Sequence, residues 1–280
     1  MKKNSPIAAQ NDCGASATHH DFSNFKLTCG FAKRDITPAA GIFLAGNGEY
    51  QSIGINDPLY THAVVCMDNH EWVALVSTDL IGIEYETVLD VRKILKANGC
   101  GKPENVFISC THTHNGPHTR FSNDLFLSHR DEKYMERLGR SIAEAIMEAD
   151  RSRVPVKMKY ARGYAFENFN RRIVMPDNQS YFYTPSLIKN HPEIARHVHG
   201  IADPELDAIQ LSKEDGSIFL TLSHYAAHPL TLGMYKNVIS ADFPGMVVKH
   251  LASHYKSEAV FFRGHAATCT PRDYLRDFSE

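Results

Sequence analysis

Three histidines lie close together in the segment Ile108-Ser-Cys-Thr-His-Thr-His-Asn-Gly-Pro-His118, which continues the apolar run at residues 106–108. Neutral imidazole is the commonest protein ligand for zinc, and a single residue separates His112 from His114, so a bend after the run decides which of the two faces a metal. One of them could bind a metal while the other transfers protons or contacts a substrate. The alternative interpretation is a polar loop whose histidines only meet solvent.

The predicted strands and helix that precede this loop determine where its histidines lie. Residues 62–67 and 72–78 predict two strands, because apolar and β-branched residues flank the turn signal Asp68-Asn69. Residues 84–98 predict a helix with one apolar face, which Gly99 ends, and a strand at residues 106–108 follows. The histidines then stand at the carboxyl end of a strand, where the active sites of α/β proteins usually lie.

The second half of the chain shows the same pattern, in which a histidine follows a predicted strand. A helix is predicted over residues 131–149, and a hairpin over residues 206–212 and 217–224 leads into His228-Pro229. Residues 239–245 then open another helix. Two histidines at separate strand ends suit one shared metal, so we expect His112 and His228 to converge on one ion. The alternative for His228 is a core histidine bonded to a backbone carbonyl. The predicted fold class is α/β, with mixed β-sheets flanked by helices and a metal site at strand carboxyl ends.

The composition limits the classes of partner that the chain is expected to bind. The 280 residues carry 30 Lys+Arg against 32 Asp+Glu, so no basic surface argues for nucleic acid, and no apolar run is long enough for a transmembrane segment. A small molecule is the expected partner, and the oligomeric state is open. The six cysteines lack a CxxC pair and are interpreted as scattered thiols. With no signal peptide visible at the start, a cytoplasmic location is expected.

Several segments, in order, resemble the neutral (non-lysosomal) ceramidase family. Thr111-His-Thr-His-Asn-Gly-Pro117 is similar to its Thr-His-Thr-His-Ser-Gly-Pro signature, with Asn115 in place of the usual serine. The likeness covers residues 30–263. The other matching segments are Phe31-Ala-Lys-Arg-Asp-Ile-Thr-Pro38, Gly54-Ile-Asn-Asp-Pro-Leu-Tyr60, Asn168-Phe-Asn-Arg-Arg172, Tyr225-Ala-Ala-His-Pro229 and Ile239-Ser-Ala-Asp242.

The resemblance implies a zinc-dependent amide hydrolase of sphingolipid metabolism, acting on N-acylsphingosine or a related lipid-like amide or ester. By position it implies that His112 and His228 bind Zn²⁺, that His114 has a catalytic role beside the metal, and that Arg171 contacts the substrate or the developing oxyanion. Without the family, Arg171 could be a surface arginine beside Arg172. Zinc would lower the pKa of water and polarise the carbonyl, and Arg171 offers a charge that stays protonated.

The chain also departs from the family. The resemblance implies further glutamate and tyrosine ligands from a region far beyond His228, and two histidines are too few for a catalytic zinc. Asp57, Asp79 and Asp242 lie near strand ends and could supply an oxygen ligand, or could cap a helix or close a turn. The family's Gly-Asp-Val-Ser-Pro segment is missing after Phe261-Phe262, where Thr270 is the only comparable hydroxyl and is not assigned as a nucleophile.

These departures lead to a prediction about the reading frame. If the codons of residues 264–271 are read in a frame shifted by one base, they can encode Gly-Asp-Val, one further residue and Pro, which is the pattern of the missing segment. Residues 264–280 are therefore expected to be an out-of-frame or irregular tail. Residues 1–23 are expected to be disordered, and residues 24–263 to form one incomplete ceramidase-like domain. Two alternatives remain: an incomplete, inactive metal-binding fragment, or another metallohydrolase such as a phosphoesterase, although a metallo-β-lactamase-like His-x-His-x-Asp-His string is absent.

Overall fold

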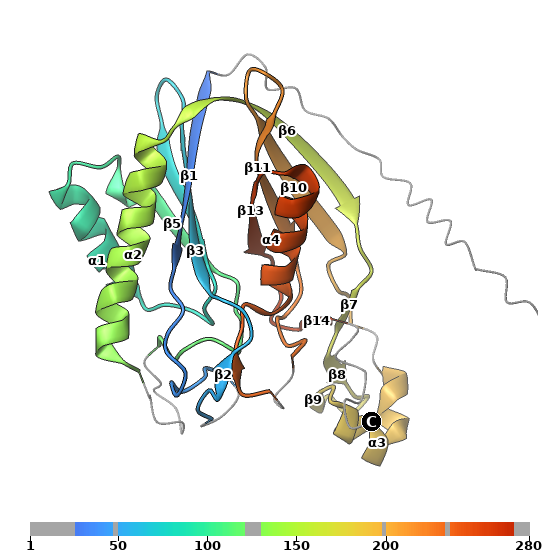
Figure 1. The fold of residues 1–280 in the computed structure, drawn as a ribbon. Helices are drawn as coiled ribbons and strands as arrows, with labels where there is room; N and C mark the ends of the chain where they lie inside the picture. Colours follow the sequence, from blue (N-terminus) through green and yellow to red (C-terminus); the bar gives the residue numbers. More distant parts are fainter. Residues whose placement is uncertain (1–25, 47–49, 121–129, 198–199, 233–235, 272–280) are drawn as a thin grey trace, which may run out of the picture.

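The computed structural model describes residues 26–46, 50–120, 130–197, 200–232 and 236–271. An eight-stranded sheet with the strand order β13-β11-β10-β6-β1-β3-β4-β5 forms its centre (Figure 1). Neighbouring strands are antiparallel, except for the parallel pairs β4–β5 and β11–β13. The strands of this sheet are β1 Leu27–Asp35, β3 Tyr60–Met67, β4 Trp72–Thr78, β5 Val106–Cys110, β6 Val154–Tyr164, β10 Glu205–Ser212, β11 Ile218–Tyr225 and β13 Glu258–Arg263.

Helices and three small two-stranded sheets complete the described fold. The small sheets pair β12 with β2, β14 with β7 and β8 with β9. The helices are α1 Tyr85–Ala97, α2 Glu132–Arg151, α3 Pro185–Asn190 and α4 Asp242–Tyr255, with 3-10 turns at Pro103–Asn105 and Pro192–His197; the short strands are β2 Gly54–Ile55, β7 Asn168–Asn170, β8 Arg172–Val174, β9 Ser180–Phe182, β12 Val238–Ile239 and β14 Cys269–Pro271. Within the described ranges, no helix is both long and apolar enough to cross a membrane.

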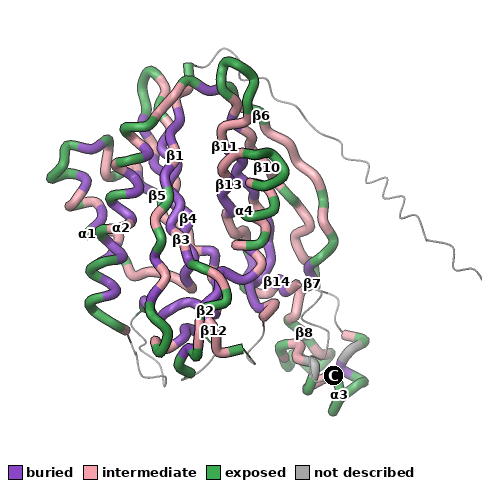
Figure 2. The backbone as a smooth tube through the Cα atoms, viewed as in Figure 1, coloured by how far each residue is buried: buried purple, intermediate pink, exposed green. Residues whose placement is uncertain are grey.

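The two halves of the large sheet pack face to face. Val64 of β3 shares an apolar cluster with Val260 of β13, although the two strands are far apart in the sheet order. Because side chains alternate along a strand, Ala63 and Val65 point the other way and pack beneath α1 and α2. Phe261 contacts α4 on the far side. The layers are therefore helix, sheet, sheet and helix, and the buried segments in Figure 2 follow the strands between them.

Most of the elements predicted around the histidine loop are found. The hairpin β3–β4 and the hairpin β10–β11 both form, and β4, α1 and β5 make a strand-helix-strand unit with β4 parallel to β5. Helix α2 begins after Asp131, whose carboxylate accepts hydrogen bonds from the amides of Lys133 (2.9 Å) and Tyr134 (3.1 Å). The predicted α/β fold class, with mixed strands flanked by helices, is confirmed.

The long strand β6 was not predicted, although it joins the two halves of the sheet. It pairs with β1 through Val154 and Val156 and with β10 along the rest of its length. Its apolar and basic residues alternate from Val154 to Lys159, which is the pattern of a half-buried strand. Pro155 weakens that signal, because proline cannot donate to a sheet.

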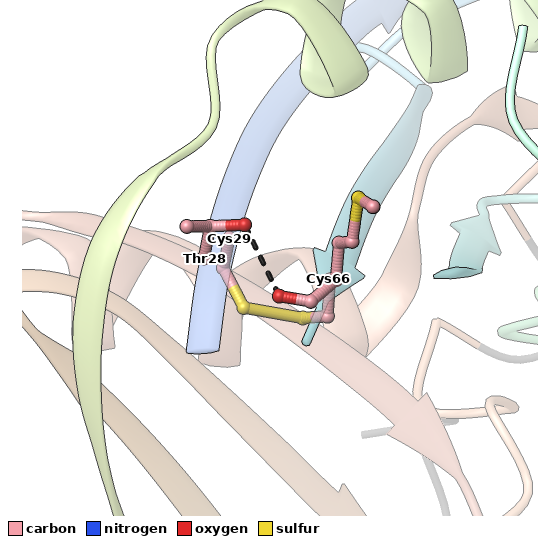
Figure 3. The surroundings of a disulfide bond; sticks show 4 residues. Thr28, Cys29 and Cys66 are labelled. Atoms are coloured by element: carbon pink, nitrogen blue, oxygen red, sulfur yellow. Dashed lines mark hydrogen bonds between the residues drawn. A yellow bond between two sulfur atoms is a disulfide. The ribbon is translucent and has the colours of Figure 1, made fainter. Parts of the chain in front are cut away.

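A disulfide joins Cys29 of β1 to Cys66 of β3, so the interpretation of all six cysteines as scattered thiols is wrong for this pair (Figure 3). The antiparallel register sets the two residues directly opposite each other, with their Cα atoms 4.3 Å apart. Next to them, the Thr28 hydroxyl donates to the Met67 carbonyl (3.1 Å). Sequence spacing cannot reveal a cross-strand pair 37 residues apart. The cytoplasmic location stays a prediction, and a disulfide favours an oxidising compartment instead.

The predicted domain limits fall partly outside the described residues. The segment expected to be disordered, residues 1–23, lies there, as do residues 272–280. Of the expected irregular tail, residues 264–271 are described, and within them β14 pairs with β7. Whether this stretch is read in another frame stays a prediction.

Candidate metal centre

The histidine loop leaves the end of β5 and turns at once. The amide of Thr111 still donates to Thr78 of β4 (2.9 Å), but that of His112 donates to the Leu80 carbonyl beyond the strand (2.8 Å). His112 has a φ of 72°, in the left-handed region that non-glycine residues rarely adopt. A strained residue of this kind persists only where its surroundings hold it, and such residues gather at functional sites.

In the segment of residues 111–115, residues that anchor the loop alternate with the two histidines. Thr111, Thr113 and Asn115 are all buried, while the intervening histidines are only partly covered. Thr111 donates to the Asp79 carboxylate (3.2 Å), and Thr113 donates to the Ser240 carbonyl (2.7 Å). The Asn115 amide donates to two carbonyls of the segment before α4, those of Lys236 (3.0 Å) and Val238 (2.9 Å).

We expect Asn115→Ala to weaken both the fold and metal binding. Its loss leaves two backbone carbonyls without their donor, at a cost of about 1–3 kcal/mol, and frees the loop that carries the histidines. Urea unfolding and zinc titration measure the two effects. Asn105→Ala is the matched control, because the Asn105 amide also donates to a carbonyl, that of Trp72 (3.1 Å), away from the loop. An Asn115 variant with unchanged zinc affinity would contradict this role.

His228 reaches the same place from the other half of the sheet. It lies three residues beyond β11 and is 4% exposed. Its amide donates to the Cys269 carbonyl (2.7 Å), and its Nδ1 lies 3.0 Å from the Ala266 carbonyl oxygen. The expectation that His112 and His228 converge is met, since their ring centroids are 4.7 Å apart.

A third imidazole completes the group. The Nε2 atoms of His114 and His228 are 2.9 Å apart, and one ligand atom from each of His112, His114 and His228 lies within 4.8 Å of the others. Among the described residues no other such group of metal-binding side chains occurs, and this group includes neither His118 nor a carboxylate.

The backbone fixes the protonation of all three rings. The Nδ1 atoms of His112, His114 and His228 face the carbonyls of Ile81 (2.6 Å), Gly46 (3.2 Å) and Ala266 (3.0 Å). Because a carbonyl oxygen only accepts, each Nδ1 carries the ring proton, and each Nε2 keeps a lone pair for a metal.

Burial keeps these imidazoles neutral. Desolvation is the main cause that lowers the pKa of His112 to about 4 and of His228 to about 3, and it also lowers the pKa of His114. Nearby arginine charges act in the same direction. Neutral imidazole is the form that binds metal, so the three side chains are ready to bind at neutral pH.

The donor set fits a zinc ion. With neutral rings, the Nε2 lone pairs of His114 and His228 face each other at 2.9 Å, which is unfavourable unless a metal ion or a shared proton lies between them. Two zinc–nitrogen bonds of 2.0–2.1 Å at a tetrahedral angle separate their nitrogens by roughly 3.3 Å. The observed spacing is close to that requirement.

The three aspartates considered as oxygen ligands are engaged elsewhere. Asp79 accepts from the Tyr60 amide (2.9 Å) and from Thr111, and burial raises its pKa to about 7. Asp57 accepts from the Ala241 amide (2.8 Å) and from the Ser240 hydroxyl. Asp242 accepts from Thr231, Leu232 and Phe243. Their geometry is that of turn closure and capping.

Arg171 lies beside the group and is partly buried. Its amide donates to Thr268 (2.8 Å), its guanidinium donates to the Ala267 carbonyl (3.1 Å), and its charge stands 5.2 Å above the Phe182 ring. Its positive charge also contributes to lowering the pKa values of His114 and His228, after burial as the main cause.

Gly46 and the backbone acceptors were missed by sequence reasoning. Gly46 has a φ of 83°, and a Cβ there would lie 2.4 Å from Nδ1 of His114, so only glycine leaves room for that ring. Carbonyl groups carry no residue-type signal, so the sequence could not reveal the acceptors at Ile81 and Ala266.

These observations define an α/β protein with a group of three histidines at its strand ends that could hold a metal ion. Residues 27–267 match the family model described as neutral/alkaline non-lysosomal ceramidase, N-terminal. The chain therefore belongs to the neutral/alkaline non-lysosomal ceramidase family, as the resemblance indicated.

Relatives agree with this assignment. The neutral ceramidase of Pseudomonas aeruginosa is 28% identical over an alignment of 251 residues that covers 85% of this chain and 35% of that protein. The crystal structure of that organism's neutral ceramidase matches 89% of this chain and 40% of its own, with a TM-score of 0.73 and 24% identity. A structure of ceramidase complexed with C2 matches with a TM-score of 0.72, 23% identity and 89% and 39% coverage. The chain thus spans less than half the length of these relatives.

Proposed function

We propose that this chain carries the metal-binding part of a zinc-dependent amide hydrolase whose substrate is N-acylsphingosine or a related lipid amide. The observation that supports it most is the convergence of three neutral imidazoles, which place one ligand atom each within 4.8 Å of the others, with the Nε2 atoms of His114 and His228 2.9 Å apart. Membership of the ceramidase family supports the amide as the bond that is cleaved.

In this proposal His112 and His228 hold the zinc ion, and the Ile81 and Ala266 carbonyls keep their rings in the binding tautomer. When bound there, zinc supplies the Lewis acid that polarises an amide carbonyl and lowers the pKa of water. His114 accepts and returns a proton through Nε2, because its Nδ1 is engaged with Gly46. Arg171 provides the positive charge for the oxyanion.

Two other assignments make different predictions. If His114 is a third zinc ligand, the centre has the three protein ligands usual for a catalytic zinc without the glutamate and tyrosine that the family resemblance implies. If the chain is an inactive fragment, it binds little zinc or binds it without turnover. A phosphoesterase has no supporting observation beyond the metal site itself.

Zinc content and turnover, measured on the purified chain, test the proposal. We expect one zinc per chain, and release of fatty acid from N-acylsphingosine that stops on chelation and returns when zinc is restored. The control substrate is a phosphate monoester, which should stay intact. A chain with one zinc that releases no fatty acid would support the inactive metal-binding fragment, and a chain without stoichiometric zinc would contradict the metal site.

A further inference from the structure

Arg263 stands at the candidate metal centre, and the functional assignment above does not use it. It is the last residue of β13, paired in register with Tyr225 at the end of β11. Three residues later, Ala266 supplies the carbonyl that holds His228. The side chain of Arg263 therefore leaves the sheet at the edge from which the histidines also come.

This guanidinium has no counter-ion among the described residues. Arg263 is partly buried, and its Nε is shielded from solvent without a hydrogen-bond acceptor. No carboxylate in the described ranges forms an ion pair with it. A partly buried charge that lacks a protein partner is costly, so such a group is usually paired with something else.

The surroundings add further positive charge. Arg171 lies nearby, because it donates to the carbonyls of Ala267 and Thr268, which directly follow the Ala266 that holds His228. Arg120 stands two residues after His118, at the end of the histidine loop. Arg120 has Glu84 at 3.6 Å, and Arg171 contacts a carbonyl and an aromatic ring. A surplus of cationic groups around a metal centre attracts an anion rather than a neutral molecule.

We propose that Arg263 binds a carboxylate on the substrate, so that the site prefers acyl amides whose amine half carries a carboxylate, such as N-acyl amino acids, over neutral acyl amides. A planar guanidinium matches a carboxylate in two parallel hydrogen bonds. This inference rests on the proposed amide hydrolysis, which determines that the ligand is an acyl amide.

Equilibrium binding to the full chain tests it with three soluble probes: N-octanoylglycine, its neutral counterpart N-octanoylethanolamine, and octanoate. A hydrogen-bonded charge pair contributes roughly a 10- to 100-fold difference in affinity. We expect the unaltered chain to bind N-octanoylglycine at least tenfold more tightly than N-octanoylethanolamine in calorimetry, with the difference falling at high salt. Equal binding of the two amides would overturn the proposal without any variant.

The variants locate the effect. Arg263→Gln should bring N-octanoylglycine to the affinity of the neutral amide, and Arg263→Lys should recover part of the preference. Arg140→Gln, at an exposed arginine paired with Glu136 on α2, is the matched control and should change nothing. If Arg263→Gln still binds N-octanoylglycine more tightly than N-octanoylethanolamine, the assignment is refuted. It is also refuted if this substitution weakens the binding of octanoate but not that of N-octanoylglycine.

Hydrolysis measured in parallel separates this inference from the proposed function. If neither amide is cleaved but the carboxylate preference depends on Arg263, the hydrolase assignment fails and the carboxylate site stands. If both amides are cleaved and bound equally well, the hydrolase assignment stands and the role of Arg263 is wrong.

Discussion

Alanine at His112 or at His228 is expected to abolish zinc binding. Each change removes an Nε2 whose ring is oriented by a backbone carbonyl, at 2.6 Å for His112 and 3.0 Å for His228. Loss of an outer partner of a metal ligand already costs 10–100-fold in affinity, so loss of the ligand itself should cost more than about 100-fold. Metal analysis of the dialysed proteins measures this directly.

The same alanine substitutions and metal analysis test the roles of His114 and Arg171. His114→Ala and Arg171→Ala should keep zinc and lose turnover, because their proposed roles follow metal binding. His250→Ala, which removes an exposed histidine of α4, is the control and should keep both. Full zinc in the His112 variant would refute its assignment as a ligand, and a zinc-free His114 variant would make His114 the third ligand.

The second large effect is expected at Asp242. This residue is 4% exposed, has a φ of 57°, and accepts hydrogen bonds where α4 begins. The donors are the amides of Leu232 (3.2 Å) and Phe243 (2.6 Å) and the hydroxyl of Thr231 (2.6 Å). Asp242→Ala leaves these groups unsatisfied and strains the left-handed backbone, so it should destabilise the fold by about 3 kcal/mol or more.

Urea unfolding gives the size of this effect, with two comparisons. Asp242→Asn should cost less, because asparagine tolerates the left-handed region and keeps one acceptor oxygen. Asp215→Ala should shift the unfolding midpoint least, since Asp215 accepts from Ser217 (2.9 Å) in an exposed hairpin turn. Equal midpoints for the Asp242 and Asp215 alanine variants would show that Asp242 is not a structural anchor.

The sequence was sufficient to predict the approach of His112 and His228, because both follow apolar strand patterns with clear turn signals. It could not decide between a third ligand and a catalytic role for His114. That choice depends on where the Gly46 carbonyl lies, and this follows from tertiary packing. For the same reason the tethering roles of Thr113 and Asn115 were missed, although their alternation with the histidines was visible.

The pairing of Cys29 with Cys66 shows a different limit. The antiparallel register of β1 and β3 decides it, and a one-residue slip would have turned one of the cysteines to the opposite face. Asp57, Asp79 and Asp242 show a third limit. A carboxylate near a strand end has the same sequence signal whether it binds a metal or closes a turn, and only its hydrogen-bond donors distinguish the two.

The reading frame of the final residues and the limits of the domain stay predictions.

The anchoring of His228 by Ala266 and Cys269 also sets a time at which the site can form during synthesis. The ribosome adds about 5–20 residues per second, so His112 is made many seconds before the carbonyls that orient its partner histidine. Until then the growing chain carries the loop of His112 and His114 without the third imidazole. Tight metal binding should therefore begin only after residue 269 has left the ribosome, and nascent chains stopped earlier should bind zinc weakly.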